Sequence, residues 1–417
     1  MRSDSQRGQA MLLVVMLFGM ATALLVYGMV DTSTIGLRRD KDTAAAFADV
    51  KRALIGWSVR RTSSNALTDA RPGELPCPDM NNDGLEDGSC VAGAIGRVPW
   101  KTLGIPEPKD GAGETLWYAI AGPFRIWGMN FTVINSDTRG NITVYQDSTA
   151  SAITSEAIAV IFSPGAAFGT QNRDPVATAL CPTTATTIAR NLCAANYLET
   201  AAGVNNATTN GPFISAPGSD TFNDKVMAIT TADLMPVVEQ RVARESRAAL
   251  QAYRANSGCG CYPWADISDG VSQTDLNRGR IPTTALPEDW GTGTIPYLPG
   301  RDTATNGWFV NNDWRLVIYY AVGRNFLEAG GGACTSCIDP TLTFNGASGK
   351  EIVLIMPGPA GVPLVTSPCG APPLGTNAHT SWPYDYFEDC ENNDHGNDWY
   401  VSPPSTTYAR DRTYTIP

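Results

Sequence analysis

The longest apolar stretch lies near the start of the chain, at residues 10–30, and reads AMLLVVMLFGMATALLVYGMV without a charged residue. At about 1.5 Å per residue, a helix of this length measures roughly 30 Å, which matches the hydrocarbon thickness of a bilayer. A secretory signal has a shorter apolar region of about 7–15 residues and a small-residue cleavage site, which is not evident here. The pattern therefore predicts a membrane-spanning helix rather than a buried core helix.

Helical and strand patterns alternate after this stretch. Residues 43–59 and 234–255 place apolar side chains at helical spacing. Short apolar runs rich in Val, Ile and Tyr and bounded by turn residues predict strands. These runs lie at residues 116–120, 158–162, 225–230, 316–322, 352–356 and 412–416. Helices packed on antiparallel sheets of this kind predict an α+β fold.

The predicted elements occur twice in the same order. Each series has a helix, a loop rich in Cys and Pro, two strands, a Pro-Gly turn, a long polar segment and a last strand. LWYAI at residues 116–120 returns as IYYAV at 318–322, and IAVIF at 158–162 returns as IVLIM at 352–356. We therefore expect an internal duplication with two tandem modules, at residues 31–232 and 233–417. The period is too long for a solenoid repeat.

Composition narrows the class of protein. A chain of 417 residues is longer than a single hydrophobic core usually supports, so we expect more than one domain. Its net charge of −11 argues against a nucleic-acid partner. Its ten cysteines indicate an oxidising compartment, so the large part after the apolar helix should lie outside the cytoplasm. With two histidines, His379 and His395, most histidine-based triads and zinc sites are excluded.

The cysteine spacing predicts disulfide-stapled loops. Local pairs are expected between Cys77 and Cys90, Cys181 and Cys193, and Cys369 and Cys390. The remaining thiols form two close pairs in the sequence, Cys259 with Cys261 and Cys334 with Cys337. A bond within the first of these pairs would be strained, so we expect either a Cys334–Cys337 bond or bonds between the two pairs. A zinc site built from the four thiolates is the less favoured alternative.

One loop follows a calcium-binding pattern. The side chains of Asp79, Asn81 and Asp83 occupy positions one, three and five of the pattern. The carbonyl of Leu85 is at position seven and Asp87 is at position nine. A glycine at position six permits the sharp turn. Cys90 replaces the usual glutamate at position twelve. Two interpretations stay open. The loop binds calcium and is clamped by a disulfide, or it is a solvated Asx-turn loop without metal.

The junction before the apolar helix, QRGQAM at residues 6–11, resembles the leader of type IV pilins and type II secretion pseudopilins. The resemblance implies that residues 1–8 are a leader and that a prepilin peptidase cuts after Gly8 and methylates Gln9. It implies that residues 9–30 span the bacterial inner membrane once and pack against other pilins or pseudopilins. The C-terminal part would then be periplasmic, or extracellular on a filament. Calcium binding, common in pseudopilins, is also implied.

Two further features refine this resemblance. Leu13 is the fifth residue of the mature chain, a position where most members carry glutamate. The absence of this glutamate is typical of tip-type subunits, or of a protein that uses the leader only as an anchor. RPGELPCPD at residues 71–79, GRVPWKTLG at 96–104 and LWYA at 116–119 are similar to segments of prepilin-type proteins. No nucleophile elbow, zinc-protease motif or P-loop occurs.

These patterns together predict a protein that is not an enzyme. We expect a minor pilin- or pseudopilin-like component, at the tip of a type IV pilus or type II secretion filament, that acts in assembly or recognition. The alternatives are a membrane-tethered extracytoplasmic binding protein outside any filament and, less favoured, an anchored hydrolase.

Overall fold

In the computed structural model, the described residues are 4–61, 71–88, 90–91, 93–125, 133–265, 277–282, 308–309, 312, 314, 317–327, 341–356, 358, 399–401 and 412–416. Within the first helix, side chains are described at residues 15–20, at 22 and from 34 onward. Helices pack on antiparallel and mixed sheets, so the α+β prediction is confirmed.

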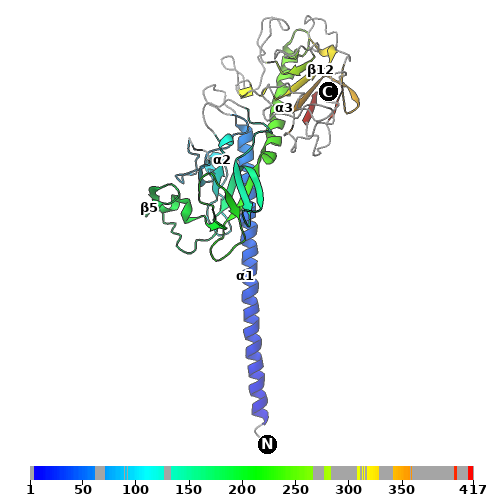
Figure 1. Cartoon of the computed structure of the whole chain (residues 1–417). Helices are drawn as coiled ribbons and strands as arrows, with labels where there is room; N and C mark the ends of the chain where they lie inside the picture. Colours follow the sequence, from blue (N-terminus) through cyan, green and yellow to red (C-terminus); the bar gives the residue numbers. More distant parts are fainter. Residues whose placement is uncertain are drawn as a thin grey trace.

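The N-terminal part of helix α1 (Asp4–Arg60) forms a stalk, and its C-terminal part packs into the head, which is the part of the molecule that contains the sheets (Figure 1). Its C-terminal part buries Phe47, Val50 and Leu54, which recur every three or four residues along one side. Its N-terminal part extends away from the sheets as a single rod. The described residues include no helix that combines the length and the apolar character needed to cross a membrane. Most side chains of the predicted span, residues 10–30, lie outside the described residues.

The first sheet has six strands and packs beside the C-terminal part of α1. Its order is β1-β2-β4-β3-β9, and β10 pairs with β4 as well. The strands are β1 (Ile95–Arg97), β2 (Trp117–Ile120), β3 (Ile142–Gln146), β4 (Ala152–Ser163), β9 (Phe213–Ser215) and β10 (Lys225–Thr230). The predicted strands at residues 116–120, 158–162 and 225–230 are all present in it.

The second sheet lies beyond the end of α1, on the side away from the N-terminus (Figure 1). Its four strands are all antiparallel, in the order β11-β12-β15-β17. They are β11 (Arg278–Arg280), β12 (Tyr319–Val322), β15 (Ile352–Met356) and β17 (Arg412–Ile416). The predicted strands at residues 352–356 and 412–416 are confirmed, and β12 occupies the second half of the one predicted at 316–322.

Smaller elements complete the described chain. Short helices are α2 (Trp100–Leu103), η1 (Gly122–Phe124), η2 (Arg190–Leu192), η3 (Ala194–Asn196) and η5 (Arg324–Phe326). The small sheets contain β5 (Thr178–Cys181), β6 (Thr186–Ala189), β7 (Thr200–Ala201), β8 (Val204–Asn205), β13 (Leu342–Phe344), β14 (Ala347–Lys350) and β16 (Trp399–Tyr400).

Two four-strand units match strand by strand. We call β1-β2-β4-β10 the first unit and β11-β12-β15-β17 the second unit. In both, every neighbouring pair is antiparallel, and Gly96 faces Tyr118 as Gly279 faces Tyr320. A bridge from Leu75 beside β2 recurs as a bridge from Tyr262 beside β12. The second unit therefore has the same strand plan as the first.

The register corrects one of the sequence matches by a single residue. Ile120 pairs with Ala159 and Val322 with Ile352, so Ala159 corresponds to Ile352. The predicted match had placed Ile158 there. A shift of one residue along a strand turns each side chain to the opposite face. Both runs are apolar throughout, because both faces of each strand are buried. Composition alone therefore does not determine which residue of one run corresponds to which residue of the other.

Helix α3 (Thr231–Asn256) joins the two units. It begins directly after β10 with a capping box between Thr230 and Asp233, and it packs against α1, β4, β10 and β15. Most of its buried apolar side chains, including Val238 and Val242, belong to one hydrophobic cluster that also contains Ile161 of the first sheet and Leu354 of the second. The two units therefore share a continuous core along α3.

Candidate functional site

The predicted processing residues, Gly8 and Gln9, belong to the N-terminal end of α1. Their backbone is helical, and their side chains lie outside the described residues. Cleavage after Gly8 therefore stays a prediction.

The predicted calcium loop is folded by hydrogen bonds to its own backbone. The Asp79 carboxylate accepts from the N–H groups of Gly84 at 2.7 Å and Asp83 at 3.2 Å. Asn81 Oδ1 accepts from Asp83 N at 2.9 Å, and the Asp87 carboxylate accepts from Met80 N at 2.6 Å. Gly84 has φ +86°, and a Cβ there would meet the Trp100 ring, so this turn requires glycine.

The polar groups of this loop are arranged as in an Asx-turn loop. Asp83 Oδ1 accepts from Leu85 N at 2.8 Å, and Lys101 donates to the Asp83 carbonyl. Burial raises the pKa of Asp79, and backbone hydrogen bonds oppose that rise. Among the residues that the structure describes, no three His, Cys, Asp or Glu side chains are grouped as metal ligands. Calcium binding here stays a prediction.

Three disulfides are present in the described chain. Cys77–Cys90 and Cys181–Cys193 confirm two predicted pairs. The third, Cys259–Cys261, corrects the expectation that this close pair would bond elsewhere. Gly260 between them adopts φ +65°, which lets the chain turn tightly. The predicted partners Cys334, Cys337, Cys369 and Cys390 lie outside the described residues.

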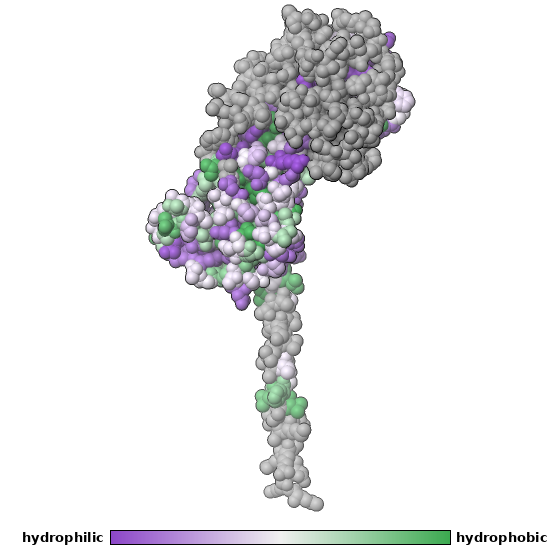
Figure 2. Space-filling model, in the orientation of Figure 1, coloured by the Kyte–Doolittle hydropathy of each residue, from purple (hydrophilic) through white to green (hydrophobic). Residues whose placement is uncertain are grey.

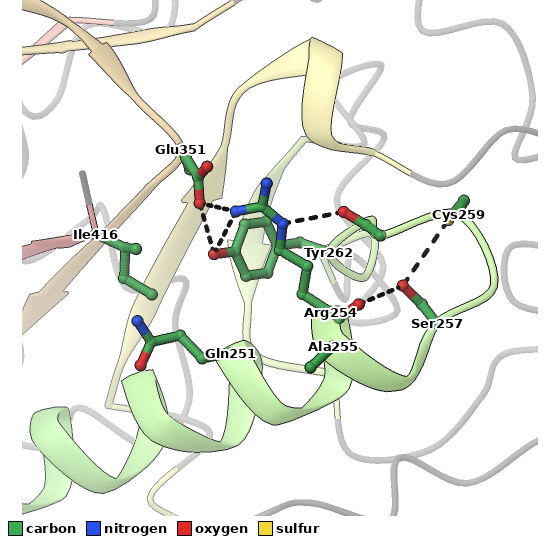
Figure 3. A pocket seen from close by; sticks show the side chains of 9 residues that line it. Gln251, Arg254, Ala255, Ser257, Cys259, Tyr262, Glu351 and Ile416 are labelled. Carbon is green, nitrogen blue, oxygen red and sulfur yellow. Dashed lines mark hydrogen bonds and ion pairs between the residues drawn. The ribbon is translucent and has the colours of Figure 1, made fainter.

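An open hollow of about 840 Å³ lies beside this third disulfide, at the C-terminal end of α3 (Figure 3). Three polar side chains from three elements meet in it. Arg254 comes from the last turn of α3, Tyr262 from the loop after the disulfide and Glu351 from the residue before β15. Tyr262 Oη donates to Glu351 Oε2 at 2.8 Å, and Arg254 Nη1 donates to the same oxygen.

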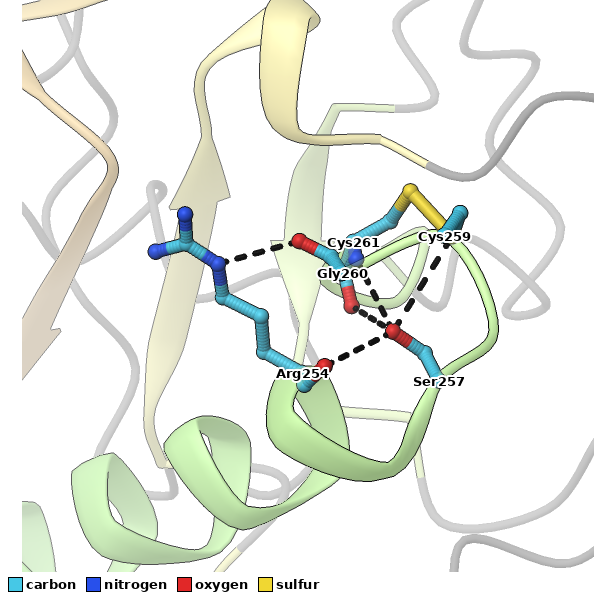
Figure 4. Close-up of a disulfide and its surroundings, with 5 residues drawn as sticks. All are labelled: Arg254, Ser257, Cys259, Gly260 and Cys261. Carbon is cyan, nitrogen blue, oxygen red and sulfur yellow. Dashed lines mark hydrogen bonds between the residues drawn. A yellow bond between two sulfur atoms is a disulfide. The ribbon is translucent and has the colours of Figure 1, made fainter.

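The turn after α3 holds Arg254 in place. Its Nε donates to the Gly260 carbonyl at 3.0 Å, and its guanidinium carbon lies 5.1 Å from the centre of the Tyr262 ring. Ser257 Oγ donates to the Arg254 carbonyl and accepts from Cys261 N, both at 2.9 Å (Figure 4). The disulfide turn and the helix end therefore position this arginine together.

The electrostatics of the hollow follow from this contact. The hydrogen bond to Glu351 raises the pKa of Arg254, so its guanidinium stays charged. Burial raises the pKa of Tyr262 to about 12, so its phenol stays a donor at neutral pH. Arg254 and Glu351 oppose each other in charge, so the hollow is polar with little net charge. Such a site is suited to binding through hydrogen bonds.

Arg254 and Glu351 carry no motif by which the sequence alone would identify them as site residues. They are 97 residues apart, and nothing in their local sequence indicates that they meet. Tyr262 follows Cys259 and Cys261, whose spacing indicates only disulfide chemistry. The signal that could have found the group is the comparison of matched positions in the two units, where polar residues replace apolar ones.

Comparisons with known proteins give no independent support for any function. Neither the family models, nor the curated proteins, nor the solved structures that were searched include a match to this chain.

Proposed function

We propose that this chain is a minor pilin- or pseudopilin-like subunit that acts in assembly or recognition at the end of a type IV pilus or type II secretion filament. Residues 1–8 are the leader, residues 9–30 anchor the protein in the inner membrane, and the two sheet units are tandem modules of one duplicated domain. The head then lies on the periplasmic or extracellular side. The observation that supports this most is the stalk of α1.

The stalk presents apolar side chains to its surroundings. Among its described residues, Val15 is 64% exposed and Phe18 is 72% exposed, and Met16, Leu17 and Met20 are similarly open. Figure 2 shows a green, hydrophobic patch on the narrow stalk, well away from the wider part of the molecule. Exposed apolar surface of this kind is stabilised by burial in lipid or against other helices. A pilin-like helix uses both environments in turn.

The head is consistent with a position at the end of a filament. The second unit lies on the far side of the first, away from the stalk, so it extends the molecule along the direction in which α1 leaves the membrane (Figure 1). Leu13 in place of the usual glutamate supports the same position, because a terminal subunit has no subunit ahead whose amine needs a carboxylate.

The mass of the mature N-terminus tests the proposal. The full chain, expressed in a host with a prepilin peptidase, should begin at a methylated Gln9, and a Gly8→Leu variant should keep its leader. An intact wild-type leader, or a cut near residue 30, would contradict the proposal. Immunogold labelling of the head then separates a filament subunit, seen at filament ends, from a solitary membrane-tethered binding protein.

A further inference from the structure

We propose that the hollow formed by Arg254, Tyr262 and Glu351 binds a neutral saccharide. This inference concerns the second unit alone and does not depend on processing of the N-terminus. Its volume of about 840 Å³ is within the usual range of ligand sites, about 300–1,000 Å³. It differs from the usual apolar pocket because side-chain hydrogen-bonding groups dominate its wall.

The first unit shows that the fold does not need these polar groups. Leu75 N donates to the Phe124 carbonyl at 2.8 Å as Tyr262 N donates to the Phe326 carbonyl at 2.7 Å, so Leu75 matches Tyr262. Ile158 matches Glu351 by the same test, because its carbonyl accepts from Ala121 N as the Glu351 carbonyl accepts from Gly323 N. Leu75 and Ile158 are fully buried apolar residues.

The third polar residue, Arg254, also has no charged counterpart in the first unit. The helices align Leu54 with Leu250, which places Ser58 at the position of Arg254, and Ser58 is buried. The first unit thus has a buried serine and two buried apolar residues at the positions that line the hollow in the second. Replacing apolar residues with a partly buried ion pair seldom stabilises a protein. Here an ion pair and a tyrosine stand in place of two apolar residues and a serine, and a ligand explains this change better than stability does.

The chemistry of the hollow selects a ligand without net charge. Glu351 Oε2 is used by Arg254 and Tyr262, and Figure 3 shows the other carboxylate oxygen and Arg254 Nη2 pointing away from that contact. Gln251, on the preceding turn of α3, adds an amide that can donate and accept. Carboxylate, guanidinium and amide side by side match adjacent hydroxyl groups, each of which both donates and accepts. Because the charges of Arg254 and Glu351 offset each other, the hollow does not strongly attract either an anion or a cation.

A peptide fits the hollow less well. Peptides bind along a sheet edge or place apolar side chains in pockets. Here the Tyr262 ring is covered by the Arg254 guanidinium, and the apolar Ile416 is almost wholly buried. The described lining therefore offers no pocket for an apolar side chain, whereas its polar groups are concentrated in one place.

Titration calorimetry of the full chain in detergent tests this site. The probes are maltotriose, cellotriose and triacetylchitotriose, with 3′-sialyllactose as an acidic sugar and N-acetyl-trialanine amide as a peptide. We expect at least one neutral trisaccharide to bind. Glu351→Gln should weaken that binding about tenfold, because a charged acceptor is lost, and Gln251→Ala should weaken it several-fold.

Gln240→Ala is the matched control, because Gln240 is exposed on α3 outside the hollow. It should bind the sugar as the wild type does, and near-ultraviolet circular dichroism should show the same fold for all variants. The proposal is overturned if no neutral sugar binds, if the acidic sugar or the peptide binds more tightly, or if Glu351→Gln and Gln251→Ala bind like Gln240→Ala. None of these outcomes bears on the mass of the N-terminus.

Discussion

The first and second units have the same strand order and register but differ in what surrounds the strands. The first unit continues into a six-stranded sheet and has three buried residues, Ser58, Leu75 and Ile158, at the positions compared. The second places Arg254, Tyr262 and Glu351 at the matched positions and leaves a hollow. The same strand order and register thus accommodate buried residues at these three positions in one unit and hollow-lining polar residues in the other.

The two units also differ in how their loops are fixed. Cys77 of the first unit is bonded to Cys90, whereas the matched position in the second carries Trp264, which is buried in the shared core. At this matched position the first unit is held by a covalent bond and the second by packing, and the disulfide of the second unit, Cys259–Cys261, lies just before it. The joint between the units, at Glu239, is where we expect the largest effect of a single substitution.

Glu239→Ala should destabilise the protein by about 3 to 5 kcal/mol, since removing one partner of a buried ion pair leaves the other unpaired. Glu239 lies on α3 and is 0% exposed. It accepts from Ser136, in the first half of the chain, and from Arg412 of β17. Urea unfolding measures the loss, and Glu239→Gln, which keeps the shape, is the control. A loss under about 1 kcal/mol would mean that this contact does not hold the units together.

The second largest expected loss of stability comes from removing the disulfide of the first unit, and it should exceed the loss from removing Cys259–Cys261 of the second. A Cys77→Ala, Cys90→Ala double variant should lose about 3 kcal/mol, because the bond closes a loop with a sequence separation of 13. Cys259→Ser with Cys261→Ser should lose much less, because a separation of 2 restricts the unfolded chain very little. Thermal unfolding of both variants checks the order. Equal losses would show that chain entropy is not what distinguishes the loops.

Much of this comparison could be predicted from the sequence. Apolar runs with β-branched residues located β2, β4, β12 and β15, and local spacing located the Cys77–Cys90 and Cys181–Cys193 bonds. The phase of Ala159 against Ile352 could not be predicted, because strands buried on both faces lack alternation. The meeting of Arg254 with Glu351 could not be predicted either, because it depends on tertiary packing across 97 residues.

A pH-dependent effect is expected in the first unit. Burial raises the pKa of Asp224 well above 3.8, and the charge of Glu199 raises it further. Asp224 Oδ2 accepts from Glu199 N at 2.9 Å and from Asn206 Nδ2 at 3.0 Å. The folded state therefore holds this proton more tightly than the unfolded chain. The resulting stability is complete below pH 3.8 and is lost as the pH rises through the raised pKa.

The slope of that loss should be at most about 1.4 kcal/mol per pH unit for one proton. Urea unfolding across the acid-to-neutral range measures it, with Asp224→Asn as the variant that cannot titrate. The variant should have a flatter profile than the wild type. Parallel profiles would show that Asp224 does not carry the proton.

The smallest expected effect compares two tyrosines that occupy matched positions. Tyr118 of β2 and Tyr320 of β12 are both fully buried. Tyr320 Oη donates to the Pro263 carbonyl at 2.8 Å, whereas Tyr118 Oη has no hydrogen-bond partner among the described residues. Tyr320→Phe should therefore cost about 1 kcal/mol, because it leaves a buried carbonyl unpaired.

Tyr118→Phe should cost about 0 kcal/mol or stabilise slightly, because it removes an unpaired buried hydroxyl without changing the ring. Both substitutions keep the volume of the core, so the difference between their urea midpoints isolates one hydrogen bond. If both substitutions lower the free energy of unfolding equally, the Tyr118 hydroxyl has a hydrogen-bond partner of equal strength in solution. The two units would then share this buried contact as well as their strand register.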